Sequence, residues 1–364
     1  MVSPNLHILI VLPHLKCGGT ERTASELANY IVEDGGNVTL LTMYKREKFY
    51  NIHPKVRLIE PDISKNKLGK YFYIFFLVIY LRTQFRKLKP DVIFALGYIA
   101  ITLFSSLSLK TKVVMSWRSN PNRVRFPENR IINRLYYLSY WLMRKRVNGI
   151  IAQTTLAAKF FKKKYDCPIV IIPNFLRELK EYKVEKQNLI INVGHCTSDK
   201  AQYYLIKAFK LLNAPDWKLM IVGEGPKRKE LEDLSISLGL FDRVIFTGYQ
   251  RDIDLYLSKS SIFAFTSVIE GYPNALIEAM ATPLPSVSFD CEAGPSDIIA
   301  DGKNGFLVKV GDIETFANRL QELIDKPALR LKIQSEASVI KKHNDLAKIA
   351  PRYVDFFSQI AETS

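Results

Sequence analysis

Two glutamates and a proline mark the segment of this sequence whose residue types best suit chemistry. In T-S-V-I-E-G-Y-P-N-A-L-I-E-A-M-A (266–281), an apolar run gives way to a Glu-Gly turn and then to a helical pattern that opens around Pro273. The first amides of such a helix lack intrahelical acceptors and can bind an anion such as a diphosphate. Glu270 and Glu278 would be repelled by that anion, so they suit the hydroxyls of a ribose or hexose. From spacing alone, two solvated glutamates remain the alternative.

Positive charge is concentrated in the first half of the chain. Residues 1–180 hold 30 Lys+Arg and 11 Asp+Glu, a balance of +19, whereas residues 181–364 hold 22 and 25, a balance of −3. This asymmetry predicts an anionic partner for the first half, such as a membrane surface or a lipid phosphate, with simple solubilisation as the alternative. The usual nucleic-acid-binding motifs do not occur, so we expect no nucleic-acid partner.

Two basic and aromatic segments are candidates for contact with a membrane. In 65–89, lysines and arginines flank only 11 continuously apolar residues, and a spanning helix needs about 20. Segment 130–146 has the same character. Such segments suit helices that lie on an anionic bilayer surface, although core-facing helices of an α/β layer would explain the apolar stripe as well. The basic excess of this half favours a peripheral membrane site.

Apolar β-branched runs alternate with helical patterns along the chain, which indicates parallel sheets flanked by helices. The expected strands are 6–12, 37–43, 91–96, 112–117 and 148–154 in the first half, and 189–194, 217–223, 243–248, 261–267 and 285–290 in the second. We expect an N-terminal domain over 1–175, a linker over 176–188 and a C-terminal domain over 189–364, with the last helix a candidate to cross back onto the first domain. Ligands bind at the carboxyl ends of such strands, so two facing domains would leave a cleft for two substrates.

The cysteines and the N-terminus bear on metal sites and location. Cys17, Cys167, Cys196 and Cys291 have no paired spacing and form no Cys/His cluster suited to zinc. The N-terminal run lacks the features of a secretory signal. We expect a cytoplasmic protein, peripheral on the inner face of the cell membrane, that needs neither a metal nor another cofactor.

A series of motifs resembles one enzyme family. The string E-G-Y-P-N-A-L-I-E-A is similar to the paired-glutamate motif of the retaining glycosyltransferases of family 4, whose architecture is called GT-B. Further similar segments occur in the family's order along the chain: C-G-G-T-E-R-T-A (17–24), I-P-N (172–174), V-G-H-C-T-S-D-K-A (193–201), V-G-E-G-P (222–226), F-T-G-Y (246–249) and F-D-C-E-A-G-P-S-D-I-I (289–299). The resemblance implies two Rossmann-like, doubly wound parallel-sheet domains that face a cleft.

The resemblance also implies roles for individual residues. Glu270 would contact the transferred sugar, with Lys200 and His195 beside the diphosphate as the other candidate catalytic residues. Arg118 and Asn120 resemble an Arg-x-Asn-Pro variant and are the candidate acceptor-binding residues, whereas Arg123, Arg125 and Arg130 fit a solvated loop. The candidate donor-binding residues are Gly18, Gly19, Gly223, Tyr249, Gly271, Tyr272, Pro273, Asn274, Ala275, Leu276 and Glu278.

This sequence departs from the family pattern at four positions. His195 stands where the family usually has arginine, and Ala201 where it usually has glycine. Pro283 replaces a usual glycine, and Asp297 a common glutamate. Because histidine titrates near neutrality, the first departure predicts weaker or pH-sensitive diphosphate binding.

These observations together predict a retaining glycosyltransferase. It would move a hexose or N-acetylhexosamine from a nucleotide diphosphate sugar, expected to be a UDP-sugar, to a lipid-linked, lipopolysaccharide or capsule glycan. Two alternatives stay open. One is a nucleotide-sugar epimerase of the same architecture, and the other is a catalytically silent subunit that binds the nucleotide sugar.

Overall fold

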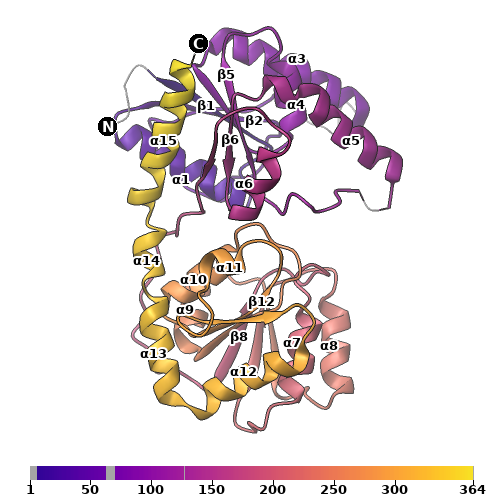
Figure 1. Cartoon of the computed structure of the whole chain (residues 1–364), viewed down its shortest axis with the longest axis vertical. Helices are drawn as coiled ribbons and strands as arrows, with labels where there is room; N and C mark the ends of the chain where they lie inside the picture. The colour runs from indigo at the N-terminus through magenta and orange to yellow at the C-terminus, as the bar shows by residue number, and fades with distance from the viewer. Residues whose placement is uncertain (1–5, 63–69, 127, 364) are drawn as a thin grey trace. The chain divides into compact units, whose positions relative to one another are not determined.

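The computed structural model describes residues 6–62, 70–126 and 128–363, which form two compact units (Figure 1). Unit 1 comprises Met1–Phe175 together with Leu346–Ser364, and unit 2 comprises Leu176–Asp345. The chain therefore leaves unit 1 at Phe175 and returns to it for its last helix. The segment 176–188, expected as a separate linker, is part of unit 2.

Unit 1 is built on a seven-stranded sheet in which every pair of neighbouring strands is parallel. The strand order is β3-β2-β1-β4-β5-β6-β7. The strands are β1 (His7–Leu12), β2 (Asn37–Thr42), β3 (Arg57–Ile59), β4 (Val92–Ala95), β5 (Lys112–Trp117), β6 (Gly149–Ala152) and β7 (Ile169–Ile171). The central strands are continuous apolar runs because helices cover both of their faces.

Helices cover the two faces of this sheet in two groups. One face packs against α1 (Gly19–Glu33) and α15 (Leu346–Glu362). The other packs against α3 (Lys70–Leu88), α4 (Ile99–Ser105), α5 (Arg130–Met143) and α6 (Thr155–Lys162). A short 3-10 turn, η1 (Arg144–Arg146), follows α5. Side chains of Asn129 and Thr154 accept hydrogen bonds from the first turns of α5 and α6 and so fix where these helices begin.

The helices expected at a membrane are core-facing and also apolar on their outer side. On α3, Tyr73, Leu77, Leu81 and Phe85 are buried at four-residue spacing. The outward side of the same helix exposes Phe72, Ile74, Phe75 and Ile79. Residues 65–69 of the predicted membrane segment lie outside the described residues. Burial in the α/β layer therefore explains only part of the apolar character of this segment.

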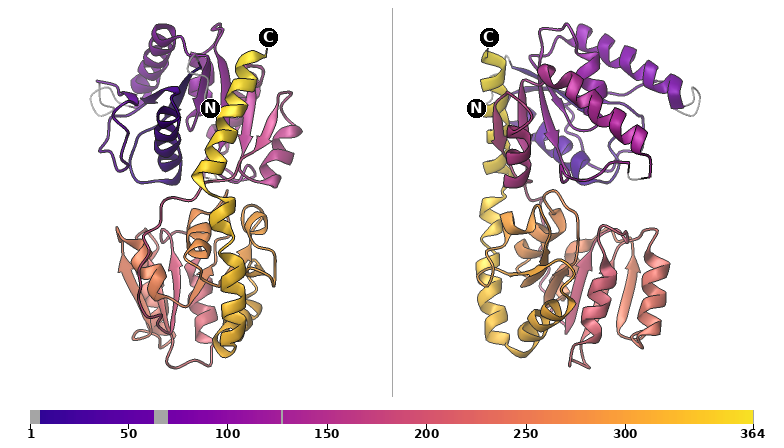
Figure 2. Two further views of the ribbon diagram at one scale, coloured as in Figure 1. Left: turned by 90° about the vertical axis from the view of Figure 1, so that its left-hand side faces the viewer. Right: turned by 45° about the vertical axis from the view of Figure 1, so that its right-hand side comes forward.

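Helix α5 is covered even less. Of its 14 residues only Tyr140 is buried. The exposed apolar residues of the helix are Ile131, Ile132, Leu135, Leu138, Trp141 and Leu142. Figure 2 shows α3 and α5 on the same side of the unit 1 sheet. In the part of the chain that the structure describes, no helix is both long and apolar enough to span a bilayer.

Unit 2 contains a parallel six-stranded sheet of order β10-β9-β8-β11-β12-β13. Its strands are β8 (Leu189–Val193), β9 (Lys218–Val222), β10 (Val244–Gly248), β11 (Ile262–Phe265), β12 (Ser286–Asp290) and β13 (Phe306–Lys309). One face packs against α7 (Gln202–Lys210), α8 (Arg228–Ser237) and α12 (Ile313–Asp325). The other packs against α9 (Ile253–Lys259), α10 (Asn274–Ala281), α11 (Pro295–Ile298) and α14 (Ile340–His343), and α13 (Pro327–Ala337) contributes to both cores.

The strand orders define a switch point in each sheet, where consecutive strands begin to be added on the opposite side. In unit 1 it lies between β1 and β4, and in unit 2 between β8 and β11. Since all strands are parallel, the loops that leave these strands meet at one edge. Ligand sites of open α/β sheets lie at such edges, which is where the candidate residues follow.

Candidate functional site

The switch point of unit 2 brings together two of the predicted catalytic residues. Lys200, in the loop after β8, lies with its Nζ 2.5 Å from Oε1 of Glu270, in the loop after β11. The backbone N–H of Val268 donates to the carbonyl of Asp199 (2.8 Å), which ties the two loops together. Both side chains are largely covered, at 26% and 12% exposure. A lysine and a carboxylate thus neutralise each other where the fold places its ligand.

Helix α10 begins directly beside this pair. Pro273 is its N-cap, so the helix starts at Asn274, one residue after the proline, and no side chain caps it. The first intrahelical bond runs from the N–H of Ile277 to the carbonyl of Pro273 (3.3 Å). The amides of residues 274–276 therefore precede the helical hydrogen-bond pattern, as an anion site at a helix start requires.

Some predicted donor-binding residues reach this region only through their backbone. The side chain of Leu276 is fully buried in the unit 2 core. Tyr272 is also buried, its hydroxyl accepts a hydrogen bond from Nδ2 of Asn344 (3.0 Å), and burial raises its pKa to about 12. The side chains of Tyr272 and Leu276 thus hold the turn before α10 in place, while Ala275 is half-buried.

Glu278 is held by an arginine that the sequence analysis did not single out. Nε of Arg177 lies 3.2 Å from Oε2 of Glu278, and its Nη1 donates to Oδ2 of Asp254 (2.8 Å). The carboxylates are 9% and 4% exposed. Burial alone would lower the pKa of Arg177, but hydrogen bonds and charges from Asp254 and Glu278 outweigh it and hold the pKa above its ordinary value. Arg177 therefore holds the Glu278 side chain in position.

The segment after β10 contains Asp252-Ile253-Asp254, an Asp-x-Asp string with a spacing that can bind divalent ions. Here Asp254 is paired with Arg177, while Asp252 accepts from the Tyr182 hydroxyl and lies 3.7 Å from Nζ of Lys180. Among the described residues, no group of three or more His, Cys, Asp or Glu side chains could hold a metal ion.

Three glycines let the loops at this edge pack backbone against backbone. A Cβ at Gly223 would lie 2.0 Å from the carbonyl oxygen of Gly194, and one at Gly294 would lie 2.5 Å from that of Gly271. Gly225 approaches the carbonyl of Cys196 in the same way, at 2.4 Å. At Gly294 a φ of +98° also excludes most other residues. The close approach of these loops fixes the edge on which Lys200 and Glu270 stand.

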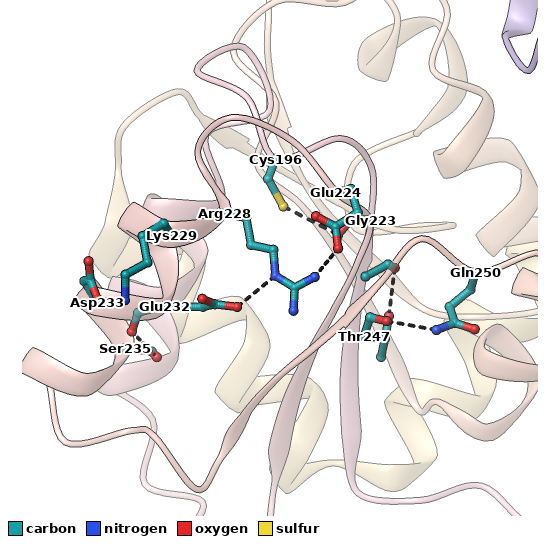
Figure 3. A network of polar contacts seen from close by, with 11 residues as sticks. Cys196, Gly223, Glu224, Arg228, Lys229, Glu232, Asp233, Ser235, Thr247 and Gln250 are labelled. Atoms are coloured by element: carbon teal, nitrogen blue, oxygen red, sulfur yellow. Dashed lines mark hydrogen bonds and ion pairs between the residues drawn. The ribbon is translucent and has the colours of Figure 1, made fainter.

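His195 follows β8 and Tyr249 follows β10, at the same edge of the sheet but with β9 between the two strands. His195 is exposed, and its Nδ1 is 3.2 Å from the carbonyl oxygen of Glu224, which only accepts, so the proton is assigned to Nδ1. Tyr249 follows β10 and is 51% exposed. Figure 3 shows the adjacent Arg228 between Glu224 and Glu232. Arg228 is compensated by two carboxylates and Lys200 by only one, so Lys200 and the α10 amides are the stronger candidates to bind phosphate.

Ala201 is one of four described residues other than glycine with a left-handed backbone. Its φ is +48° and ψ is +41°, immediately before α7. An L-residue is strained in this region, whereas glycine is not. The glycine expected from the family at this position is therefore explained by the backbone that the loop adopts.

The corresponding edge of unit 1 carries the glycine-rich loop. Gly18 has an extended backbone. Its N–H donates a hydrogen bond to the Tyr50 hydroxyl (3.1 Å), and the same hydroxyl donates to the Gly18 carbonyl (2.9 Å). A Cβ at Gly18 would lie 2.2 Å from Oε2 of Glu21, so the glycine makes room for this side chain. Gly19 is the first residue of α1. Neither Tyr50 nor Glu21 was predicted, because their contacts are set by the folded loop.

Arg118 and Asn120 follow β5 at this edge. Nη2 of Arg118 donates to Oγ1 of Thr23 (2.7 Å) and to Oδ1 of Asn174, and burial lowers its pKa. Its Nη1 is buried without an acceptor in hydrogen-bond geometry. Asn120 is buried and accepts from the N–H of Asn122 (2.8 Å), which closes a turn. Arg118 therefore stands close to α1 behind the glycine-rich loop, and Asn120 shapes the loop after β5.

Family models match the two halves of the chain. The model described as Glycosyltransferase Family 4 matches residues 17–177, and that described as Glycosyl transferases group 1 matches residues 177–339. An uncharacterized glycosyltransferase of Haemophilus influenzae is 30% identical over 335 residues, covering 91% of this chain and 94% of that protein. A Campylobacter jejuni relative, N-acetylgalactosamine-N,N'-diacetylbacillosaminyl-diphospho-undecaprenol 4-alpha-N-acetylgalactosaminyltransferase, is 26% identical, covering 94% and 96%.

Solved structures match over the whole length of the chain. Anabaena HepE in complex with UDP-glucose has a TM-score of 0.79 at 18% identity and covers 98% of this chain and 100% of its own. Sucrose-phosphate synthase from Thermosynechococcus elongatus has a TM-score of 0.82 at 16% identity, covering 99% and 100%. At these identities the likeness shows the fold, which is the two-sheet arrangement called GT-B.

Proposed function

Because this chain belongs to the group 1 glycosyltransferases and has their GT-B fold, we propose that it is a retaining enzyme that transfers a hexose or N-acetylhexosamine from a UDP-sugar. The acceptor is a lipid-linked, lipopolysaccharide or capsule glycan. The observation that carries the proposal is the pairing of Lys200 with Glu270 at the unit 2 switch point, beside the start of α10. This edge supplies a cation, helix amides and hydroxyl acceptors together.

Each group has a role that its chemistry allows. The α10 amides and Lys200 bind the diphosphate, and Glu270 accepts hydrogen bonds from hydroxyls of the transferred sugar. Glu278, positioned by Arg177, accepts from the ribose hydroxyls. Until the donor binds, Lys200 and Glu270 balance each other's charge.

Transfer with retention needs no protein nucleophile. The bond between the anomeric carbon and the β-phosphate oxygen breaks, and the acceptor oxygen bonds to the same face of that carbon. The acceptor proton passes to the departing phosphate oxygen. The protein stabilises the negative charge that builds on this phosphate, and preorganised donors of this kind contribute about 3–4 kcal/mol each. Lys200 and the helix amides are placed for this task, so the proposed reaction needs no divalent ion.

The names of relatives support the choice of donor and acceptor. HepE has been solved with UDP-glucose, and the Campylobacter relative is named for transfer to a diphospho-undecaprenol-linked sugar. Relatives from Erwinia amylovora and Rhizobium meliloti are named for amylovoran and lipopolysaccharide core biosynthesis. A lipid-linked acceptor would be reached at the inner face of the cell membrane.

The outer face of the α3, α4 and α5 layer supports this location. It exposes large apolar side chains, among them Phe72, Phe75 and Ile131 at 68–75% exposure. Residues 63–165 contain 21 Lys+Arg and only two Asp+Glu. Apolar anchors within a basic field bind anionic bilayers, each nearby cation contributing about 1 kcal/mol. Sedimentation with anionic but not with zwitterionic phospholipid vesicles tests this placement.

The activity assay combines purified protein, a panel of UDP- and GDP-sugars and a membrane lipid extract, with products identified by mass. We expect transfer from a UDP-sugar that continues in EDTA. Glu270→Ala should reduce transfer at least 100-fold in protein that circular dichroism shows to be folded at the assay temperature, and Glu185→Ala, at an exposed position away from this edge, is the control. Transfer by Glu270→Ala within a few-fold of wild type would refute the site. Donor turnover without any acceptor would instead indicate an epimerase.

A further inference from the structure

Unit 1 contains a pocket of about 480 Å³ that is lined by none of the residues given a role in the proposed transfer. It lies between the end of β5, helix α5 and helix α6, and its volume is in the range of small-molecule sites. Seven of its lining residues are aromatic: Trp117, Tyr137, Tyr140, Trp141, Phe160, Phe161 and Tyr165. The floor is rigid, because Tyr140 and Phe161 are buried and both rings pack against Trp117, with centroids 5.2 and 6.1 Å away.

The remaining lining residues give the pocket a positive rim. Besides Pro121 they are Arg144, Lys163 and Lys164, and no lining residue is acidic. Arg144 stacks over Trp141 at 4.4 Å, and Lys164 lies 3.9 Å from the centre of Phe160. Among the described residues, none of these three cations forms an ion pair with a carboxylate. The pocket therefore combines apolar walls with uncompensated positive charge at its edge.

The pocket adjoins the exposed apolar face of α5. Trp141 belongs to both, because it lines the pocket and is 57% exposed on the helix surface. A hydrocarbon chain in contact with the outer face of α5 could enter the pocket without crossing water.

We propose that this pocket binds one molecule of a lipid phosphate, with the hydrocarbon chain against the aromatic walls and the phosphate at Arg144, Lys163 and Lys164. This inference deepens the acceptor assignment and rests on the proposed function for its biological meaning. Apolar walls alone would suit a neutral chain, and the cations alone would suit any phosphate. Their combination requires both parts in one ligand.

Calorimetry with full-length protein, in the absence of any sugar donor, tests the pocket directly. The probe is farnesyl phosphate below its critical micelle concentration, with farnesol, inorganic phosphate, glucose 1-phosphate and dihexanoyl phosphatidate in parallel. We expect farnesyl phosphate to bind at least tenfold more tightly than farnesol, inorganic phosphate or glucose 1-phosphate. If dihexanoyl phosphatidate binds and farnesyl phosphate does not, the lipid phosphate is a membrane phospholipid rather than an isoprenyl carrier. Equal binding of glucose 1-phosphate would overturn the lipid assignment in favour of a sugar site.

Matched variants locate the binding. Lys163→Glu/Lys164→Glu should weaken farnesyl phosphate about 30-fold, which corresponds to about 2 kcal/mol. Lys159→Glu/Lys162→Glu makes the same charge change at exposed positions of α6 that do not line the pocket, and should have under a threefold effect. Trp141→Ala should weaken binding at least fivefold, whereas the equally exposed Leu142→Ala should not.

Equal effects of both charge-reversal pairs, or of Trp141→Ala and Leu142→Ala, would show nonspecific surface binding and overturn the inference. Because no donor or transfer enters this measurement, its failure leaves the unit 2 donor site untouched. Conversely, loss of transfer in Glu270→Ala says nothing about lipid binding.

Discussion

Removal of the Arg177 side chain isolates the charge network that positions Glu278. The Arg177→Met substitution keeps a long side chain but removes its charge. Asp254 and Glu278, at 4% and 9% exposure, then lack the cation that they share. Removing one partner of a buried ion pair costs about 3–5 kcal/mol, since the remaining charge stays buried. For a unit of this size, about 2–4 °C per kcal/mol gives a loss of roughly 6–20 °C in Tm.

Arg228→Met is the matched control. Arg228 also lies between two carboxylates, but Glu224 and Glu232 are 47% and 33% exposed. Solvent screens such pairs, so we expect a loss of less than about 1 kcal/mol. Calorimetry or urea unfolding of the full chain measures the loss of stability in both variants. The fluorescence of Trp217, the only tryptophan of unit 2, follows the unfolding of that unit.

A neutral partner substitution provides a second readout of the same network. Because it removes one of the two unpaired carboxylates, Arg177→Met/Glu278→Gln should recover part of the stability that Arg177→Met loses. If Arg177→Met destabilises no more than Arg228→Met, or if the double variant recovers none of the loss, the buried network does not hold Glu278.

Two further predictions concern backbone conformation and pH. Ala201→Gly relieves a left-handed residue and should stabilise unit 2 by about 0.5 kcal/mol, since a strain of about 1–2 kcal/mol is partly offset by glycine's entropy. Gly294→Ala should destabilise unit 2 by at least about 2 kcal/mol, whereas Gly302→Ala should cost only about 1 kcal/mol, because a Cβ at Gly302 would have no atom within 4 Å. Urea unfolding measures the stability of all three variants. Equal losses at Gly294 and Gly302 would contradict the close packing of Gly294 against Gly271. In unit 1, burial lowers the pKa of His7, so the unfolded chain binds this proton more readily. The contribution of the neutral His7 to stability should be fully present above pH 6.5 and decrease as the pH falls towards the folded-state pKa. His7→Gln should reduce the difference in stability between unfolding curves at pH 5.5 and pH 7.5.

The sequence predicted the strands that are long or fully buried, and it missed three strands that are both short and partly exposed. β1, β2, β8 and β9 are runs of five or six residues with mostly buried side chains, so their apolar pattern is strong. β3 and β7 have only three residues each, partly exposed, and β13 has four with one exposed end. Pairing with a neighbouring strand, not composition, makes these segments strands, so no local pattern could identify them.

The same distinction applies to the candidate site residues. The family resemblance singled out Lys200 and Glu270, and both lie in loops that follow strands, at the edge where α/β sheets place ligands. Arg177 lies 77 residues from Asp254 and 101 from Glu278 in sequence, so its role exists only after folding. The membership of α15 in unit 1 is non-local in the same sense. Tyr353, Phe357 and Ile360 make a strong apolar face, but only the structure shows that it packs with Phe94 and Val114.

The distribution of charge differs between the two units. Unit 1 contains 30 Lys+Arg and 12 Asp+Glu, and unit 2 contains 22 and 24. The proposed dianionic donor would gain little from the long-range field of a slightly acidic unit, so its affinity would come from close donors such as Lys200 and the α10 amides. The field of unit 1, at a balance of +18, acts over a Debye length and suits the proposed membrane surface or lipid phosphate. In that proposal, the exposed apolar side chains of α3 and α5 supply the short-range part of the interaction.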